Sequence, residues 1–305
     1  MSDSRTRRLI LTCAAGLSVL LVVIIAGKSA FGKRMDKETE SCPVPVNLNE
    51  TLTNEMSDTS CLAGFDKIVK DYLTYWGIHG ASLSVMRNDS LLFAKGYGEA
   101  DTDKKMGPGN ILRMASVSKL VTAVGIMVLQ ERGLLSIKDH VFGPDGILND
   151  SAYVAAIKDT LYNRITVEDL LRHKGGFSKR GGDPMFSTRW IMMQNGWKEV
   201  PTQEQLMEIQ LKRRVKFVPG TAQEYSNFGY LALSMVIEKV SGMDYETFMQ
   251  ENVLRPIGCV DFHIAGNYYK HKLPNETRYY VQHDDEPAEE FNNSGRHRHR
   301  NWHCS

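Results

Sequence analysis

Ser116 and Lys119 are the first residues along the chain whose types and spacing could do chemistry together. They are three positions apart at the start of the apolar stretch RMASVSKLVTAVGIMVLQERG, residues 113–133. On a helix this spacing puts both side chains on one face, one turn apart. Burial disfavours the ammonium form of a lysine, and a neutral amine can take the hydroxyl proton of a serine. The pair therefore predicts a serine nucleophile with a lysine base.

The residues around this pair predict where it lies on the helix. Ser116 is expected at the helix N-terminus, where backbone N–H groups and the positive dipole end favour the negative charge of an acyl-transfer intermediate. A plain N-cap is the alternative role for Ser116, and Ser118 is expected only to cap or to pack. The neighbouring side chains predict burial on nearly every side: Ala115, Val117, Leu120, Val121, Val124, Ile126, Val128 and Leu129.

A second motif, Tyr225-Ser226-Asn227, lies in a loop before a long apolar helix that is expected to end at Gly242. A tyrosine there could share the proton of the serine or protonate a leaving group. Asn227 could donate to a substrate amide or orient the lysine. The alternative is structural, with Tyr225 as a half-buried aromatic residue and Asn227 as an N-cap.

Capping residues predict two helices between these motifs. In ITVEDLLRHKGGF, Thr166 is expected as the N-cap with Asp169 at the third helical position, and Gly175-Gly176 end the helix. In PTQEQLMEIQLKRR, Thr202 repeats the same pattern. Both signals are local, because a capping residue needs only the N–H groups of the turn that follows it.

Upstream of Ser116 the sequence predicts one helix followed by a β-hairpin. An amphipathic helix is expected from Leu62 in LAGFDKIVKDYLTYWG, with its apolar face made of Leu62, Phe65, Ile68, Val69, Tyr72 and Leu73. A hairpin follows, with strands near 81–87 and 90–98 joined at Arg87-Asn88-Asp89.

Three stretches in this order, 111–139, 165–177 and 217–258, resemble the serine β-lactamase-related family over roughly residues 62–265. The family includes class C β-lactamases, DD-peptidases, certain esterases and the animal β-lactamase-like proteins, of which the animal branch is most similar. The resemblance implies an α/β (α+β) fold, with an antiparallel sheet flanked by helices and a helical subdomain, and no cofactor. It implies Ser116 as acylated nucleophile, Lys119 as its base, Tyr225 as proton shuttle and Asn227 as a substrate-binding residue.

The chain departs from the family pattern at two places. The block usually written H-T-S-G reads His173-Lys174-Gly175-Gly176, and His173 is expected to be a packed loop residue. No K-T-G or H-x-G element and no further sheet strands follow Asn227, so we expect a chain truncated at its C-terminus. The competing hypothesis is therefore a catalytically inactive, membrane-tethered interaction or scaffold protein.

The N-terminal end of the chain predicts a membrane tether. Residues 9–27 carry no charge and are long enough for a transmembrane signal anchor, after a cytoplasmic segment 1–8. Residues 28–61 are expected to form a stalk, residues 62–265 the domain and residues 266–305 a polar, disordered tail. A cleaved signal peptide, giving a secreted protein, and a mitochondrial presequence are the alternatives.

Sequons and cysteines agree with a lumenal or extracellular body. Five N-x-S/T sequons occur, at Asn49, Asn88, Asn149, Asn275 and Asn292. Cys42 and Cys61 are the expected disulfide pair, because both precede the globular pattern and would meet an oxidising compartment.

Charge excludes one class of partner. The formal net charge is +1, with 37 basic and 36 acidic residues, so nucleic acid is not expected. We expect a small-molecule or peptide substrate and no metal. The tail histidines His297, His299 and His303 have no neighbouring carboxylate to complete a metal site.

Overall fold

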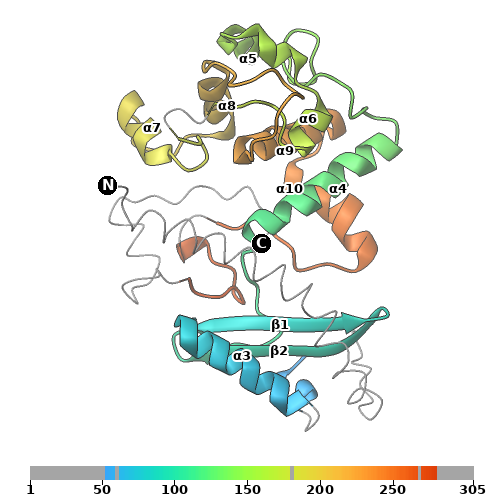
Figure 1. Cartoon of the computed structure of the whole chain (residues 1–305), viewed down its shortest axis with the longest axis vertical. Coiled ribbons are helices and arrows are strands. Elements are labelled where there is room, and N and C mark those ends of the chain that lie inside the picture. Colours follow the sequence, from blue (N-terminus) through green and yellow to red (C-terminus); the bar gives the residue numbers. More distant parts are fainter. Residues whose placement is uncertain (1–51, 59–61, 179–181, 267–268, 280–305) are drawn as a thin grey trace. The chain divides into compact units, whose positions relative to one another are not determined.

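The computed structural model describes residues 52–58, 62–178, 182–266 and 269–279 of the chain. These residues form two compact units, the first ending at Asn110 and the second beginning at Ile111 (Figure 1). The division falls inside the range 62–265 that the sequence predicted as one domain. The predicted cytoplasmic segment and the predicted anchor lie outside the described residues. Within the described part of the chain, every helix is too short or too polar to cross a membrane.

The first unit is built on a three-stranded antiparallel sheet in the order β1 (Gly80–Arg87), β2 (Ser90–Asp101) and β3 (Lys104–Lys105). The connection between β1 and β2 has two residues in the left-handed region, Asn88 at φ 48° and Asp89 at φ 60°. A two-residue hairpin turn of this kind needs positive φ at both positions, which asparagine and aspartate tolerate. The predicted hairpin is therefore confirmed.

Helix α3 (Ala63–Trp76) packs on this sheet through the residues near its start (Figure 1). Phe65 makes an edge-to-face contact with the buried Phe93, with ring centroids 5.2 Å apart. The helix was predicted correctly, but the predicted apolar face is only partly covered. Ile68 is 59% exposed and Tyr72 is 43% exposed.

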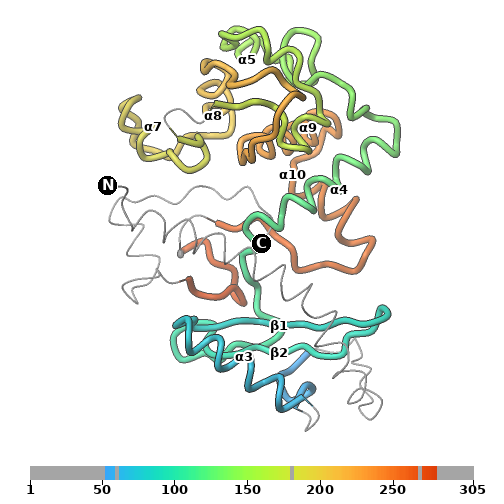
Figure 2. The backbone as a smooth tube through the Cα atoms, in the orientation of Figure 1, coloured from blue at the N-terminus to red at the C-terminus, as the bar shows by residue number. Residues whose placement is uncertain are grey.

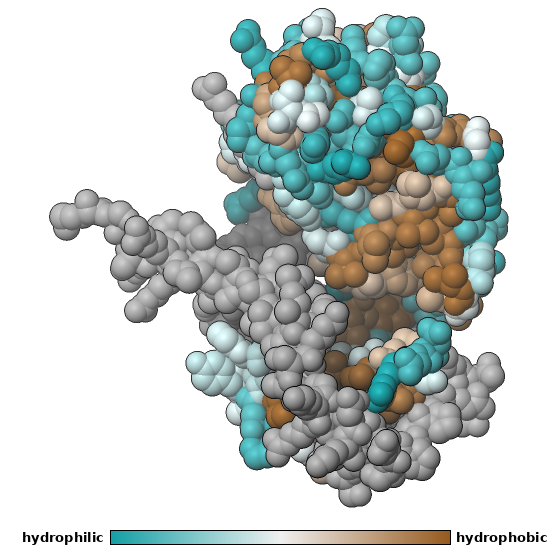
Figure 3. Space-filling model, turned by 45° about the vertical axis from the view of Figure 1, so that its right-hand side comes forward, coloured by the Kyte–Doolittle hydropathy of each residue, from teal (hydrophilic) through white to brown (hydrophobic). Residues whose placement is uncertain are grey.

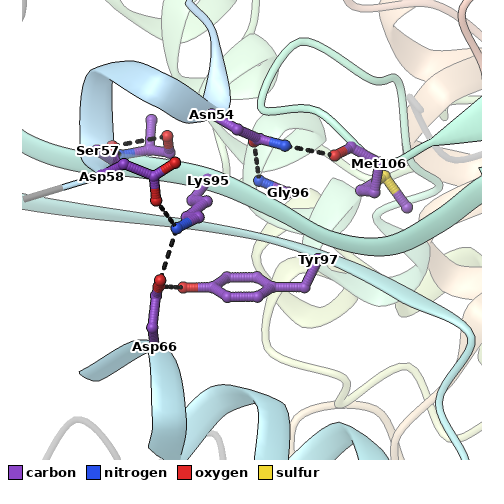
Figure 4. A network of polar contacts seen from close by, with 9 residues as sticks. Asn54, Ser57, Asp58, Asp66, Lys95, Gly96, Tyr97 and Met106 are labelled. Atoms are coloured by element: carbon purple, nitrogen blue, oxygen red, sulfur yellow. Dashed lines mark hydrogen bonds and ion pairs between the residues drawn. The ribbon is translucent and has the colours of Figure 1, made fainter. Parts of the chain in front are cut away.

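The short 3₁₀ helix η3 (Asn54–Ser57) is bound to the sheet, so the prediction that residues 28–61 form a stalk is wrong for residues 52–58. Asn54 Nδ2 donates to the carbonyl of Met106 at 2.9 Å, and Asn54 Oδ1 accepts from the backbone N–H of Gly96 at 2.8 Å (Figure 4). Ser57 is buried, and its hydroxyl donates to the carbonyl of Ala94 at 2.9 Å. Polar residues looked like a linker in the sequence because their partners are distant along the chain.

The described part of the second unit is helical, apart from isolated bridges. Its elements in order are η5 (Ala115–Val117), α4 (Ser118–Glu131), α5 (Ser151–Ala156), η6 (Thr160–Arg164), α6 (Val167–Leu171), α7 (Thr188–Asn195), α8 (Gln203–Leu211), α9 (Asn227–Ser241), α10 (Tyr245–Met249), the π-helical turn η7 (Gln250–Leu254), η8 (Arg255–Ile257) and η9 (Tyr269–His271).

Helix α9 lies at the centre of the core of this unit, and α4 packs against it (Figure 2). Along α9 the apolar side chains from Phe228 to Ile237 are almost all buried, and each fully buried large apolar side chain contributes about 1.5–3 kcal/mol. On α4, a Cβ at Gly125 would lie 2.7 Å from Met249 Sδ of α10, so the glycine permits close approach. Gly242 ends α9 at φ 70°, as predicted.

The predicted burial of α4 on nearly every side is wrong for one face. Ile126 and Leu129 are fully buried, but Val117, Leu120, Val124 and Met127 are between 42% and 68% exposed. Their spacing of three or four residues puts them on one stripe of the helix. Figure 3 shows hydrophobic side chains gathered in one area of the surface of this unit.

Both predicted capping boxes are present. The Thr166 hydroxyl accepts from the backbone N–H of Asp169, and Thr202 makes the same bond with Gln205. The predicted end of the first helix is wrong, because α6 stops at Leu171 rather than at the glycine pair.

The segment 269–279 is docked on the residues before α4, although it was predicted to belong to a disordered tail. Glu276 is 2% exposed and its carboxylate accepts from Arg113 Nε at 3.0 Å. Backbone hydrogen bonds of 2.9 Å join Ile111 to Asn275 and to Thr277. The Arg113–Glu276 ion pair explains why a polar sequence can be buried here.

Candidate active site

Ser116 lies in a tight turn at the entrance to α4. It is an exposed residue of η5, which continues directly into α4, so the prediction of a position at the helix N-terminus is confirmed. The preceding residue, Ala115, has φ 47°, an unusual value for a residue with a Cβ. Backbone strain of this kind persists where the surrounding structure holds the turn in place.

The Ser116 hydroxyl is in contact with two of the side chains predicted from the sequence. Its Oγ is 2.7 Å from the Tyr225 hydroxyl, and either group can donate. Lys119 Nζ donates to the same Oγ at 3.3 Å. The structure therefore brings the serine, the lysine one turn later and a tyrosine from a distant loop to one point.

Lys119 is 6% exposed, and its terminal nitrogen lies among defined partners. Nζ donates to Asn227 Oδ1 at 2.9 Å. It also lies 5.0 Å from the centroid of the Tyr225 ring and 5.6 Å from that of Tyr230, distances at which an aromatic face attracts a cation. These contacts hold the amine beside Ser116.

The loop before α9 is fixed by the cap of that helix. Ser226 is the N-cap, and its hydroxyl accepts from the backbone N–H of Gly229 at 3.1 Å. The alternative in which Asn227 caps the helix is therefore wrong, and its side chain reaches Lys119. Because the Asn227 amide already bonds within the protein, the geometry favours the lysine-orienting role over the substrate-binding role.

His173 packs behind Tyr225, in agreement with the prediction of a packed loop residue. It adopts φ 57°, which turns the chain after α6. Its ring centroid is 4.6 Å from that of Tyr225 and 5.2 Å from that of Tyr230. Its Nδ1 accepts from the backbone N–H of Ser226 at 3.3 Å. His173 thus supports the tyrosine without touching Ser116 through any of these contacts.

Tyr230 forms the buried side of the site. Burial raises the pKa of its hydroxyl, and the neighbouring Tyr225 adds to the effect. The protonated hydroxyl donates to the carbonyl of Leu171 at 3.1 Å. Tyr230 therefore links α9 to the end of α6 and presents its ring, not its hydroxyl, to Lys119.

Asp183 was missed from the sequence. Its Oδ2 accepts from Asn227 Nδ2 at 3.1 Å and from the backbone N–H of Asn227 at 3.3 Å. Arg213 Nη1 donates to the carbonyl of the preceding Gly182 at 2.8 Å. Residues Gly182-Asp183-Pro184 read as an ordinary turn in the sequence, and no spacing relates this segment to Asn227.

The remaining predicted positions fall into two groups. Asn88, Asn149 and Asn275 are described by the structure, and all three are exposed. The rest lie outside the described residues: the sequons at Asn49 and Asn292, the expected disulfide of Cys42 with Cys61, and the tail histidines His297, His299 and His303.

Among the described residues, no cluster of three or more His, Cys, Asp or Glu side chains could hold a metal ion. The groups that meet here are the Ser116 hydroxyl, an amine, a phenol and an amide. This set suits proton transfer and nucleophilic attack.

Comparison with known proteins shows which family the chain belongs to. The family model described as Beta-lactamase matches residues 65–299. Penicillin-binding protein 4* of Bacillus subtilis is 26% identical over 165 residues, which are 53% of this chain and 32% of that protein.

Two solved structures share the fold. The octameric penicillin-binding protein homologue from Pyrococcus abyssi has a TM-score of 0.55 and 23% identity, covering 74% of this chain and 50% of that one. The D-alanine carboxypeptidase AmpC from Burkholderia cenocepacia has a TM-score of 0.53 and 19% identity, covering 72% and 54%.

The chain thus spans about a third of the curated relative and about half of each solved chain. The family match covers most of the sequence, and the resemblance predicted from three motif-bearing stretches is confirmed together with the mixed α/β fold. The chain belongs to the β-lactamase family.

Proposed function

We propose that the chain is a serine hydrolase that forms an acyl-serine intermediate on an amide, peptide or ester substrate. The observation that carries the proposal is the position of Ser116 Oγ, 2.7 Å from the Tyr225 hydroxyl and 3.3 Å from Lys119 Nζ. A serine is activated when a base and a proton-transfer group lie within hydrogen-bond distance. Membership of the β-lactamase family supports the same chemistry.

In the acylation step, Ser116 Oγ attacks the carbonyl carbon of the substrate. Its proton moves to Lys119 Nζ when the amine is neutral, directly or through the Tyr225 hydroxyl. The carbonyl oxygen gains negative charge, which the N-terminal end of α4 favours. The bond to the leaving group then breaks, and the leaving group takes a proton from Tyr225, which regains one from Lys119.

Deacylation reverses the roles. A water molecule attacks the acyl carbon and gives its proton to the Tyr225 and Lys119 pair. The carboxylic acid leaves as the proton returns to Ser116 Oγ. The exposure of Ser116 and of Tyr225, which is 44% exposed, supports access of substrate and water to the reacting atoms.

The proposal includes a location. We propose that residues 9–27 are a single-pass signal anchor and that the body of the protein faces the lumen or the extracellular space. The apolar run and its basic flanks support the anchor. The exposure of Asn88, Asn149 and Asn275 supports glycosylation of the body, because an oligosaccharide can be attached only to an accessible side chain.

The activity is tested by covalent labelling. The full-length chain is incubated with a fluorophosphonate probe, which reacts with an activated serine. We expect labelling of the wild type and loss of the signal to background in Ser116→Ala. Ser118→Ala is the matched control, because Ser118 lies two positions away and contacts neither Lys119 nor Tyr225 through the bonds described above.

Each contrary result has a defined meaning. A folded wild-type chain that is not labelled contradicts the proposal and favours the non-catalytic interaction protein. Undiminished labelling of Ser116→Ala shows that another residue is the nucleophile. Circular dichroism of each sample establishes that the variants are folded.

A further inference from the structure

Asp183 is a carboxylate in contact with Asn227, which in turn contacts Lys119. It is half-buried and precedes α7, far in sequence from both motifs. Its Oδ1 accepts from the backbone N–H of Met185 at 3.0 Å, and this bond fixes the Asp183 side chain to the turn that contains both residues. Its Oδ2 faces Asn227, from which it accepts two hydrogen bonds, one from the side chain and one from the backbone.

These contacts determine which way the Asn227 amide points. The oxygen and the nitrogen of an asparagine side chain are similar in shape, so the hydrogen-bond partners decide its orientation. An ionised carboxylate can only accept. Asp183 therefore selects the Nδ2 end of Asn227, and Oδ1 turns toward Lys119, 2.9 Å away.

We propose that Asp183 is a positioning residue for acyl transfer: it fixes the Asn227 amide, and through this amide it holds Lys119 Nζ at Ser116 Oγ. This inference rests on the proposed function and deepens it. In the absence of the carboxylate, the amide could turn its NH₂ group toward Lys119. A neutral Lys119 amine would then accept from this NH₂ group with the lone pair that must face Ser116 Oγ, and the serine would lose its base.

The surroundings of Asp183 suit this role. Arg213 is half-buried and donates to the carbonyl of Gly182, so the turn that carries Asp183 is anchored to the end of α8. Pro184 and Met185 are buried, and Met185 is part of the hydrophobic core, so the turn is packed against the rest of the unit. The carboxylate also lies at the N-terminus of α9, where the helix dipole favours negative charge.

The competing role is structural. In that role Asp183 caps α9 by accepting from the backbone N–H of Asn227, and its bond to the Asn227 side chain has no effect on the reaction. The two roles differ in their dependence on the Asn227 side chain. A capping role persists when that side chain is removed, whereas a positioning role is lost with it.

The test is a double-mutant cycle in the full-length chain. Inactivation by a fluorophosphonate ester is measured over a range of concentrations, so that the maximal rate of inactivation and the half-saturating concentration are obtained separately. Asp183→Asn is the key variant, because its amide fills the same space but can donate as well as accept. We expect a maximal rate lower by about tenfold to a hundredfold and a half-saturating concentration within about twofold of wild type.

The second half of the cycle uses Asn227→Ala. Adding Asp183→Asn to this background is expected to cause no further loss of rate. An equal loss in both backgrounds, or an unchanged rate in the single variant, would overturn the proposal. Thermal unfolding of all four proteins establishes that the rates come from folded samples.

A second readout separates this inference from the proposed function. If the wild type does not react, the proposed function fails, and the orientation of Asn227 is still measurable. The side-chain ¹⁵N–¹H₂ signals of Asn227, identified by their loss in Asn227→Ala, are expected to move in Asp183→Asn. Signals that stay in place would contradict the positioning role, whatever the activity.

Discussion

Tyr225 is the residue through which the loop before α9 reaches Ser116. Its hydroxyl contacts Ser116 Oγ, while its ring packs against His173 and faces Lys119. The Tyr225→Phe variant keeps these ring contacts and removes only the hydroxyl. We expect the rate of fluorophosphonate labelling to fall by about a hundredfold, because a positioned proton-transfer group contributes roughly this factor.

Tyr230→Phe is the matched control for this variant. It removes a hydroxyl of the same chemistry from the same site, but that hydroxyl donates to the carbonyl of Leu171 and not to the serine. We expect labelling of Tyr230→Phe to stay within about threefold of wild type. Equal losses in both variants would mean that removal of either hydroxyl disturbs the site in the same way, which would contradict a proton-transfer role specific to the Tyr225 hydroxyl.

At the scale of elements, α3 is held to the sheet by a charged network as well as by packing. Asp66 accepts from Lys95 at 2.6 Å and from the Tyr97 hydroxyl at 2.7 Å, and Lys95 also donates to Asp58 (Figure 4). Burial raises the pKa of Asp66, but the hydrogen bonds from Lys95 and Tyr97 outweigh burial and hold this pKa below its ordinary value. The ionised carboxylate is thus part of the folded state.

This network predicts the pH dependence of stability in the first unit. Since the pKa of Asp66 is lower in the folded than in the unfolded chain, its contribution is complete at neutral pH. The contribution decreases as the pH falls below about 4, the ordinary value for aspartate, toward the lower folded value. Asp66→Asn is expected to lower the stability of the unit by about 1–3 kcal/mol at neutral pH and to have less effect in acid.

Hydrogen exchange of the β2 backbone amides measures this effect, after correction for intrinsic exchange rates. Asp71→Asn on the same helix is the control, because the interaction of Asp71 within the described residues is an exposed ion pair with Lys67. The control is expected to change stability by less than about 1 kcal/mol. A difference between Asp66→Asn and wild type that grows as the pH falls would contradict the assigned role.

At the scale of the whole molecule, the proposed lumenal or extracellular location predicts glycosylation. When the full-length chain is expressed in eukaryotic cells, endoglycosidase treatment is expected to increase its mobility on a denaturing gel. Replacing Asn88, Asn149 and Asn275 by glutamine is expected to remove most of this shift. Asn195→Gln is the control, because Asn195 is exposed but is not part of a sequon.

An unchanged band after endoglycosidase treatment of the wild type would reject the proposed orientation. A shift that persists in full when the three asparagines are replaced would place the glycans at other positions. Either result leaves the chemistry at Ser116 unaffected, because none of the three sequons contributes a side chain to the site.

Features that depend on neighbours along the chain could be predicted from the sequence. The hairpin turn at Asn88-Asp89 and the caps at Thr166 and Thr202 follow from residues within one turn of each other. The pair of Ser116 and Lys119 was predictable for the same reason, since the helical repeat fixes their distance.

Spacing along the chain does not show which distant groups meet; the tertiary structure shows this, and the family resemblance anticipated it for Tyr225 but not for Asp183. The contact of Tyr225 with Ser116 and the link from Asp183 through Asn227 to Lys119 join separate helices and loops. The exposed stripe of α4 and the buried Glu276 were predicted wrongly for a related reason. Periodicity shows which residues share a face, but burial of that face, and the pairing of a charge within it, depend on what packs there.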